Sequence, residues 1–88
     1  MTLDDVLSKN PDAAYRVYEG KGMVVLPDPG HVHVLNEIGN AVWERIDGRR
    51  TLGAILEAIL ETYDIDRDTA VRDVLEFAAA LREHKMVS

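Results

Sequence analysis

His31 and His33 are the side chains of this sequence whose type and spacing come closest to a metal site. Two positions apart on a strand, both would point to one face, and imidazole nitrogens are common zinc ligands. A zinc site also needs a third protein ligand, and the remaining histidine, His84, lies near the other end of the chain. We therefore expect exposed or partly buried strand histidines and no bound metal.

The side chains that catalysis would need are largely missing. The chain has no cysteine, which excludes disulfides, thiolate nucleophiles and cysteine metal sites. The serines, Ser8 and Ser88, lie near the two ends of the chain, where a nucleophile held in a pocket is not expected. Residues 20–22, Gly-Lys-Gly, lack the third glycine and the following helix of a phosphate-binding loop, so a hairpin turn is expected there. The sequence predicts a protein that is not an enzyme and needs no cofactor.

Charge and hydropathy exclude two further classes. Ten Lys and Arg against sixteen Asp and Glu give a net charge of −6, whereas phosphate backbones are bound by clustered positive charge. Arg45, Arg49 and Arg50 are the one local basic group, and Asp47 lies among them, so we expect a solvated turn. The apolar runs are far shorter than the roughly 20 residues of a membrane-spanning helix, and the acidic start does not resemble an export signal. We expect a cytosolic protein that binds neither nucleic acid nor membrane.

Three strands are expected to carry the histidines and the turns. Residues 15–19, 23–26 and 31–35 alternate in polarity or are rich in β-forming residues, and turn chemistry separates each pair. These short connections predict an antiparallel meander. Residues 1–14 form an N-terminal segment, in which the pattern predicts a short helix over residues 2–8.

Three helices are expected to follow. Asn36 is a good N-cap for a helix over residues 37–47, and Gly48 lies where a left-handed C-terminal residue is typical. Thr51 caps a second helix, and a third covers residues 67–84. The order β-β-β-α-α-α predicts an α+β fold, in one domain because so short a chain cannot divide its apolar residues between two cores.

Two features exceed what this core requires. The strand over residues 31–35 carries no lysine or proline to protect an open edge. The last helix has a sufficient inward stripe, to which Ala70, Phe77 and Ala80 add apolar width on one flank. An open strand edge beside such a helix is the geometry of β-strand addition, in which an extended peptide joins a sheet. Alternatively, Phe77 completes the core, and residues 1–12 or a second copy of the chain cover the edge.

A longer pattern connects the third strand to the second helix. It consists of a strand ending in Leu-Asn, a helix with a bulky residue before Asp-Gly, and Arg-Thr opening the next helix. The residues that carry it are Leu35, Asn36, Trp43, Asp47, Gly48, Arg50 and Thr51. Together with Tyr63, residues 73–77 and Leu81, this pattern resembles the PqqD-like family over residues 15–87. That family includes the peptide chaperone of pyrroloquinoline quinone biosynthesis and the recognition elements of ribosomally synthesised, post-translationally modified peptides (RiPPs).

The resemblance implies a winged-helix-like domain over residues 15–88 with no catalysis of its own. Such a domain binds the leader segment of a precursor peptide and presents it to a radical SAM protein, a cyclase or a leader peptidase. In the family, the leader pairs with the third strand and lies in a cleft beside the third helix. The implied peptide-binding residues are His31, Val32, His33, Val34, Leu35, Val74, Phe77 and Leu81, with the backbone groups of residues 31–34 setting the register.

Two readings from other classes remain open at this point. A winged-helix regulator that binds DNA or another protein would have the same order of elements, although the acidic charge opposes DNA. A structural subunit could bury the open edge in a homodimer.

Overall fold

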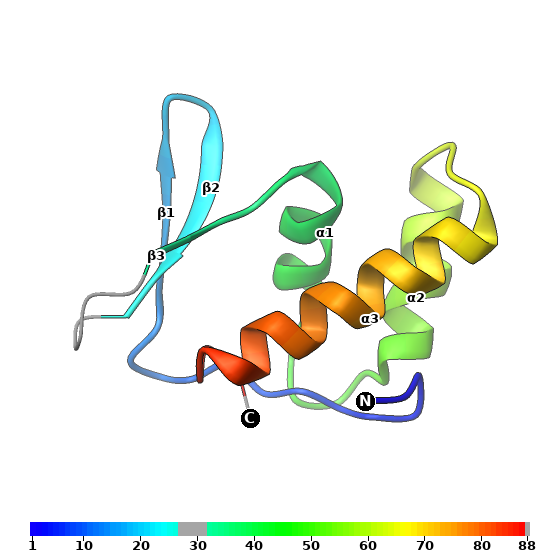
Figure 1. Ribbon diagram of the computed structural model, residues 1–88, viewed down its shortest axis with the longest axis horizontal. Coiled ribbons are helices and arrows are strands. Elements are labelled where there is room, and N and C mark those ends of the chain that lie inside the picture. The colour runs from blue at the N-terminus through cyan, green and yellow to red at the C-terminus, as the bar shows by residue number, and fades with distance from the viewer. Residues whose placement is uncertain (27–31, 88) are drawn as a thin grey trace.

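The computed structural model describes residues 1–26 and 32–87. Its elements are β1 (Ala14–Tyr18), β2 (Lys21–Val25), β3 (Val32–Val34), α1 (Glu37–Arg45), α2 (Leu52–Thr62) and α3 (Arg67–Glu83). Figure 1 shows the strands on one side and the helices on the other, with α3 running from the helical side toward the sheet. The predicted α+β order is confirmed. No helix of the described ranges is long and apolar enough to span a membrane.

The sheet has the order β1-β2-β3, and both strand pairs are antiparallel. Glu19 and Gly20 connect β1 to β2 with φ angles of 52° and 80°. Two left-handed residues in a two-residue loop are typical of the hairpin turns that match the twist of the strands. The turn therefore lies one residue earlier than the predicted Gly-Lys-Gly, and Gly22 belongs to β2. With β2 in the centre, β1 and β3 are both edge strands.

The helices begin where the sequence predicts them. The Asn36 side chain accepts a hydrogen bond from the backbone N–H of Gly39 at 2.7 Å, and the Thr51 hydroxyl accepts one from Ala54 at 3.1 Å. Helix α1 ends at Arg45 instead of residue 47. The Asp47 carboxylate instead accepts the N–H groups of Arg49 and Arg50, both at 2.9 Å. Side chains of α1, α2, α3 and the inner face of the sheet form a single core.

The short helix predicted over residues 2–8 is absent, since this segment is extended apart from one turn. The carbonyl groups of Leu3 and Asp5 accept the backbone N–H groups of Gly53 and Leu52, both at 2.8 Å. Those two amides lie in the first turn of α2, where a helix offers them no partner of its own. The segment is therefore extended because it satisfies the start of a helix some fifty residues away, which local propensity does not reveal.

The same segment continues across the base of the molecule to the end of the chain (Figure 1). Leu7 is buried in the core, and the Lys9 ammonium lies 5.0 Å from the centre of the Trp43 ring. The N–H of Asn10 donates to the carbonyl of Met86 at 2.9 Å. Residues 1–12 therefore pack against α2 and the C-terminal residues, and they do not cover the edge of β3.

Candidate functional site

Among residues 1–26 and 32–87, no strand pairs with the outer edge of β3, so its backbone groups face outward at alternate residues. The N–H of Leu35 donates to the carbonyl of Gly22 at 2.8 Å, so Leu35 faces β2. Since neighbouring residues of an antiparallel strand face opposite sides, His33 also faces β2, while Val32 and Val34 direct their N–H and C=O groups outward. The expectation that residues 31–34 all offer backbone groups is corrected accordingly for His33. His31 lies outside the described residues.

The side chains of β3 alternate in the complementary way. Val32 and Val34 are each 55% exposed on the outer face of the sheet. The His33 imidazole lies on the inner face, against α3, and its ring centre is 5.7 Å from that of Phe77 and 6.0 Å from that of His84. The open edge of β3 thus lies beside α3.

A groove of about 290 Å³ runs between β3, α3 and the start of α1. Its apolar lining is Ile38, Phe77 and Ala80, and its polar lining is His33, Asn36, Asp73 and Glu76. Phe77 is partly buried and packs against the core. An apolar floor next to a row of unpaired strand groups is the arrangement that accepts an extended peptide.

Gly39 brings the Phe77 ring close to α1. A Cβ atom at residue 39 would lie 3.0 Å from Cε1 of Phe77 and 3.2 Å from Oδ1 of Asn36. Those contacts are tighter than ordinary van der Waals packing, so a side chain at residue 39 would displace the ring. The glycine therefore helps to set the depth of the groove.

Of the three helix residues predicted to contact a peptide, only Phe77 lines the groove. Phe77 lines it, whereas Val74 and Leu81 are 0% exposed and Leu35 is 4% exposed, all within the core. The expectation that Val74 and Leu81 touch a peptide is therefore corrected. The reason is helical phase, because residues 74, 78 and 81 turn to the core while residues 73, 76, 77 and 80 turn to the groove.

The carboxylates of the groove and its α1 wall were not among the residues predicted to bind peptide. The sequence signal for the two carboxylates was available, because Asp73 and Glu76 lie four residues and one residue before Phe77 on the helix. Ion pairs within residues 1–26 and 32–87 join Asp47 to Arg50 at 3.4 Å and Glu57 to Arg67 at 2.9 Å. Neither pair includes Asp73 or Glu76, so these two carboxylates take part in no ion pair among the described residues.

His84 lies near His33, with 6.0 Å between the ring centres, although the two histidines are far apart in the sequence and were not expected to meet. Burial of the imidazole, and secondly the charge of His84, lower the pKa of His33 below its usual value. In the described part of the chain, no three His, Cys, Asp or Glu side chains are grouped so that they could hold a metal ion.

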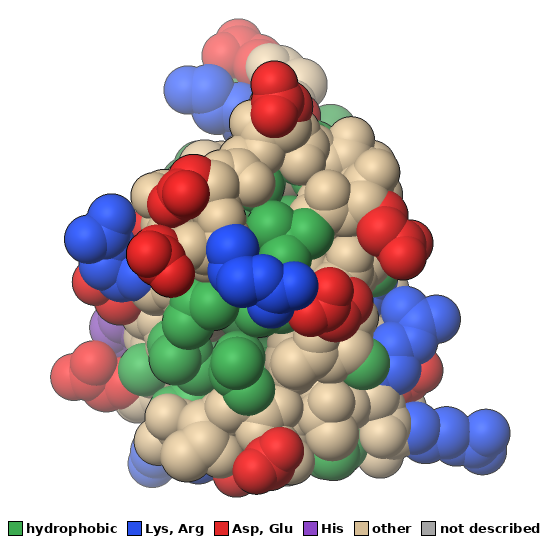
Figure 2. Space-filling view, turned by 90° about the vertical axis from the view of Figure 1, so that its right-hand side faces the viewer, with side chains coloured by type: hydrophobic (Ala, Val, Ile, Leu, Met, Phe, Trp, Pro, Cys, Tyr) green, Lys and Arg blue, Asp and Glu red, His purple; other side chains and the backbone are tan. Residues whose placement is uncertain are grey.

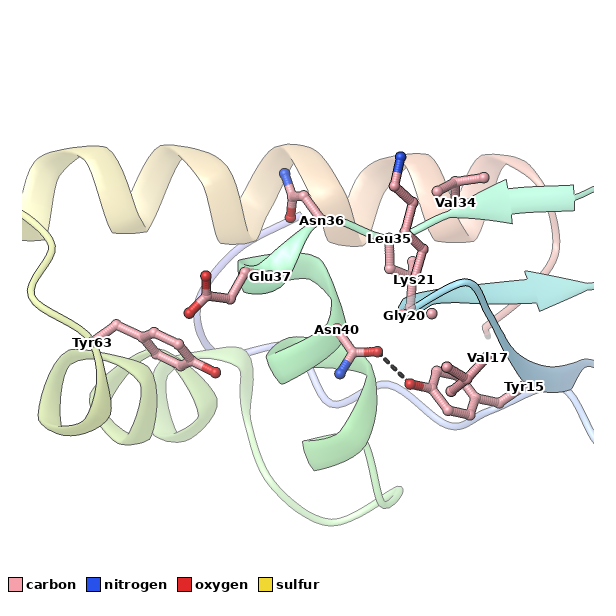
Figure 3. A pocket seen from close by; sticks show the side chains of 11 residues that line it. Tyr15, Val17, Gly20, Lys21, Val34, Leu35, Asn36, Glu37, Asn40 and Tyr63 are labelled. Atoms are coloured by element: carbon pink, nitrogen blue, oxygen red, sulfur yellow. Dashed lines mark hydrogen bonds between the residues drawn. The ribbon is translucent and has the colours of Figure 1, made fainter.

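A larger hollow, of about 660 Å³, lies beneath the β1–β2 hairpin and is shown in Figure 3. Two of its polar side chains, Tyr15 and Asn40, are hydrogen-bonded to each other. The Tyr15 hydroxyl donates to Oδ1 of Asn40 at 2.6 Å, and Nδ2 of Asn40 donates to Glu44 at 2.9 Å. The smaller groove beside β3 is the better candidate for a peptide-binding site, because it lies next to an outward-facing strand edge and has Phe77 of α3 in its floor.

The distribution of charge opposes a nucleic-acid site on the helical side. Figure 2 shows this side, with Lys and Arg side chains dispersed among Asp and Glu around a small apolar area. A phosphate backbone requires several adjacent positive charges. This face offers no such continuous basic surface.

A model of the family described as coenzyme PQQ synthesis protein D (PqqD) matches residues 22–87. The chain belongs to the PqqD family. The match includes β3, α1 and α3, the three elements that form the groove. No curated protein sequence matches this PqqD family member.

Three solved structures share the fold of this PqqD family member. "TbiB1 in Complex with the TbiA(beta) Leader Peptide" has a TM-score of 0.78 at 20% identity, covering 92% of this chain and 94% of the other. "Lasso peptide synthetase B1 complexed with the leader peptide" has a TM-score of 0.81 at 15% identity, covering 96% and 99%. The PqqD truncation of Methylobacterium extorquens PqqCD, a stand-alone RiPP recognition element, has a TM-score of 0.81 at 25% identity, covering 99% and 93%.

Proposed function

We propose that the protein binds the leader segment of a ribosomally made precursor peptide as an added strand beside β3. The observation that carries this proposal is the open edge of β3, with outward groups at Val32 and Val34, beside a groove with Phe77 in its floor. Main-chain hydrogen bonds would hold the peptide, and the groove would read its side chains.

The family supports the same function. The two structures described as leader-peptide complexes belong to proteins with this fold, and the Methylobacterium extorquens relative is described as a functional recognition element. The protein would act without catalysis of its own, presenting the peptide to a separate enzyme such as a radical SAM protein, a cyclase or a leader peptidase. No observation favours a regulator or a structural dimer over this function.

An NMR titration tests the proposal directly. The isotope-labelled protein is titrated with the leader half of a precursor peptide encoded beside its gene. We expect amide shifts at residues 32–39 on the strand side and at residues 73–80 on α3. Shifts confined to α2 or to residues 45–50 would place the site elsewhere, and a spectrum without changes would contradict leader binding.

A further inference from the structure

The alternation of a bound strand decides which of its side chains enter the groove. In an antiparallel pairing with β3, the peptide residue opposite His33 projects to the same face as the His33 imidazole. Its neighbours, opposite Val32 and Val34, project to the outer face. The next inward residue lies opposite Leu35, two positions earlier in the peptide. The groove therefore receives two side chains, at positions i and i+2 of the peptide.

The later of these two side chains meets an apolar surface. It lies opposite His33, whose ring is 5.7 Å from the Phe77 ring between centres. Ala80, one turn further along α3, lines the same part of the groove. This position suits an apolar or aromatic peptide residue, because burial of its side chain against Phe77 stabilises the complex.

The earlier side chain meets acidic groups. Helix α3 passes His33 with its C-terminal part, as the 6.0 Å separation of the His33 and His84 rings shows. Asp73, one turn before Phe77, therefore lies toward the α1 end of the groove, where Ile38 also lines it. Glu76 lies beside Phe77, and none of the described residues that line the groove is Lys or Arg. A peptide cation at this position would meet two carboxylates without a competing protein cation in the groove.

We propose that the groove selects a peptide segment in which a lysine or arginine precedes an apolar residue by two positions. The proposal rests on the proposed function and specifies its substrate. The apolar residue packs on Phe77 and Ala80, while the basic residue pairs with Asp73 and Glu76. Because both carboxylates border solvent, each ion pair contributes modestly, and added salt weakens it.

A peptide-display selection tests this specificity without knowledge of the natural partner. Short random peptides are selected on the immobilised protein at about 0.15 M salt. The selection is repeated on a D73N/E76Q variant, which keeps the shape of both side chains, and on Val34→Pro, which removes an outward donor from β3. Circular dichroism establishes that each variant is folded before selection.

We expect peptides enriched on the native protein to carry Lys or Arg two positions before an apolar residue. On D73N/E76Q the basic preference should vanish while the apolar preference stays, and a synthetic enriched peptide should bind about fivefold more weakly. Identical enrichment on both proteins would overturn the specificity but leave the proposed function, provided that Val34→Pro weakens peptide binding at least about 30-fold. If no peptide is enriched, or if Val34→Pro has no effect, both proposals are overturned.

Discussion

The two edges of the sheet offer similar backbone groups but different surroundings. Met23 of β2 faces Arg16 of β1, so Val17 points its N–H outward just as Val34 does on β3. The two valines are exposed to 64% and 55%. The β3 edge adjoins a groove lined by Phe77 and two carboxylates of α3, whereas the larger hollow that Val17 and Val34 both border is lined by no residue of α3 in the described part of the chain. An open edge becomes a binding site when the neighbouring helix can read side chains.

Matched proline substitutions at the two edges should separate them most strongly. Proline removes a backbone donor, and on an edge strand the donor faces solvent, so the fold should survive at either position. Val34→Pro should weaken leader binding at least about 30-fold, or about 2 kcal/mol. Val17→Pro should leave the Kd within about twofold of the native value, which we would regard as no effect on binding. Fluorescence polarisation with a labelled leader peptide measures both. Equal losses at the two edges would contradict the assignment of β3.

A second pair of substitutions separates the groove from the core. Phe77 and Leu75 both lie on α3 and are both partly buried, but only Phe77 lines the groove. Because both side chains are only partly buried, truncation to alanine should cost the low end of the usual range, about 2 kcal/mol of unfolding free energy for Leu75 and about 3 kcal/mol for Phe77. Phe77→Ala should also raise the Kd about tenfold. Leu75→Ala serves as the control for stability, and a similar rise in its Kd would show that lost packing accounts for the effect.

Gly39→Ala tests whether the depth of the groove limits peptide binding. The new Cβ would press on the Phe77 ring at 3.0 Å, while alanine favours the helix by about 1 kcal/mol. These effects oppose one another, so we expect little change in the unfolding midpoint and a rise in Kd of about threefold. Denaturant unfolding and the same binding assay test both halves. An unchanged Kd would mean that the position of Phe77 does not limit binding.

The smallest effect concerns pH. Burial, and secondly the charge of His84, lower the pKa of His33 below about 6.5, so the unfolded chain binds a proton at this residue more readily than the folded one. Its contribution to stability is therefore complete above pH 6.5 and is lost as the pH falls toward the lowered pKa. His33→Gln should flatten this dependence, and His84→Gln should flatten it less, because burial is the larger cause. Denaturant unfolding between about pH 7 and pH 5, above the range of the carboxylates, measures the slope. Equal slopes in His33→Gln and the native protein would contradict this origin.

The parts of the fold that depend on neighbouring residues could be predicted from the sequence. Asn36 and Thr51 cap helices within their own turns, and the alternation of residues 31–35 indicated a strand. The course of residues 2–8 could not be predicted, because its hydrogen bonds join Leu3 and Asp5 to a distant helix start.

The geometry of the candidate site could be predicted to the level of its two elements, an outward strand edge beside the last helix, but not to the level of each helix residue. Val74 and Phe77 are both apolar and three positions apart, and the pattern does not say which of the two faces the groove. The approach of His84 to His33 likewise depends on where α3 ends relative to the sheet. The orientation of Phe77 and the position of His84 both depend on contacts between elements that are distant in the sequence, which local patterns do not reveal.

The shortness of β3 has a consequence for the lifetime of a complex. The strand has three residues, and the N–H and C=O groups of its two outward residues allow four main-chain hydrogen bonds in all. At about 1 kcal/mol net each they supply about 4 kcal/mol, which corresponds to a Kd of about 1 mM. Even if side chains bring the Kd to about 1 µM, an association rate of about 10⁶ M⁻¹ s⁻¹ gives a dwell time of about one second. On the proposed function, a strand this brief would release its peptide spontaneously, quickly enough to serve one enzyme encounter after another.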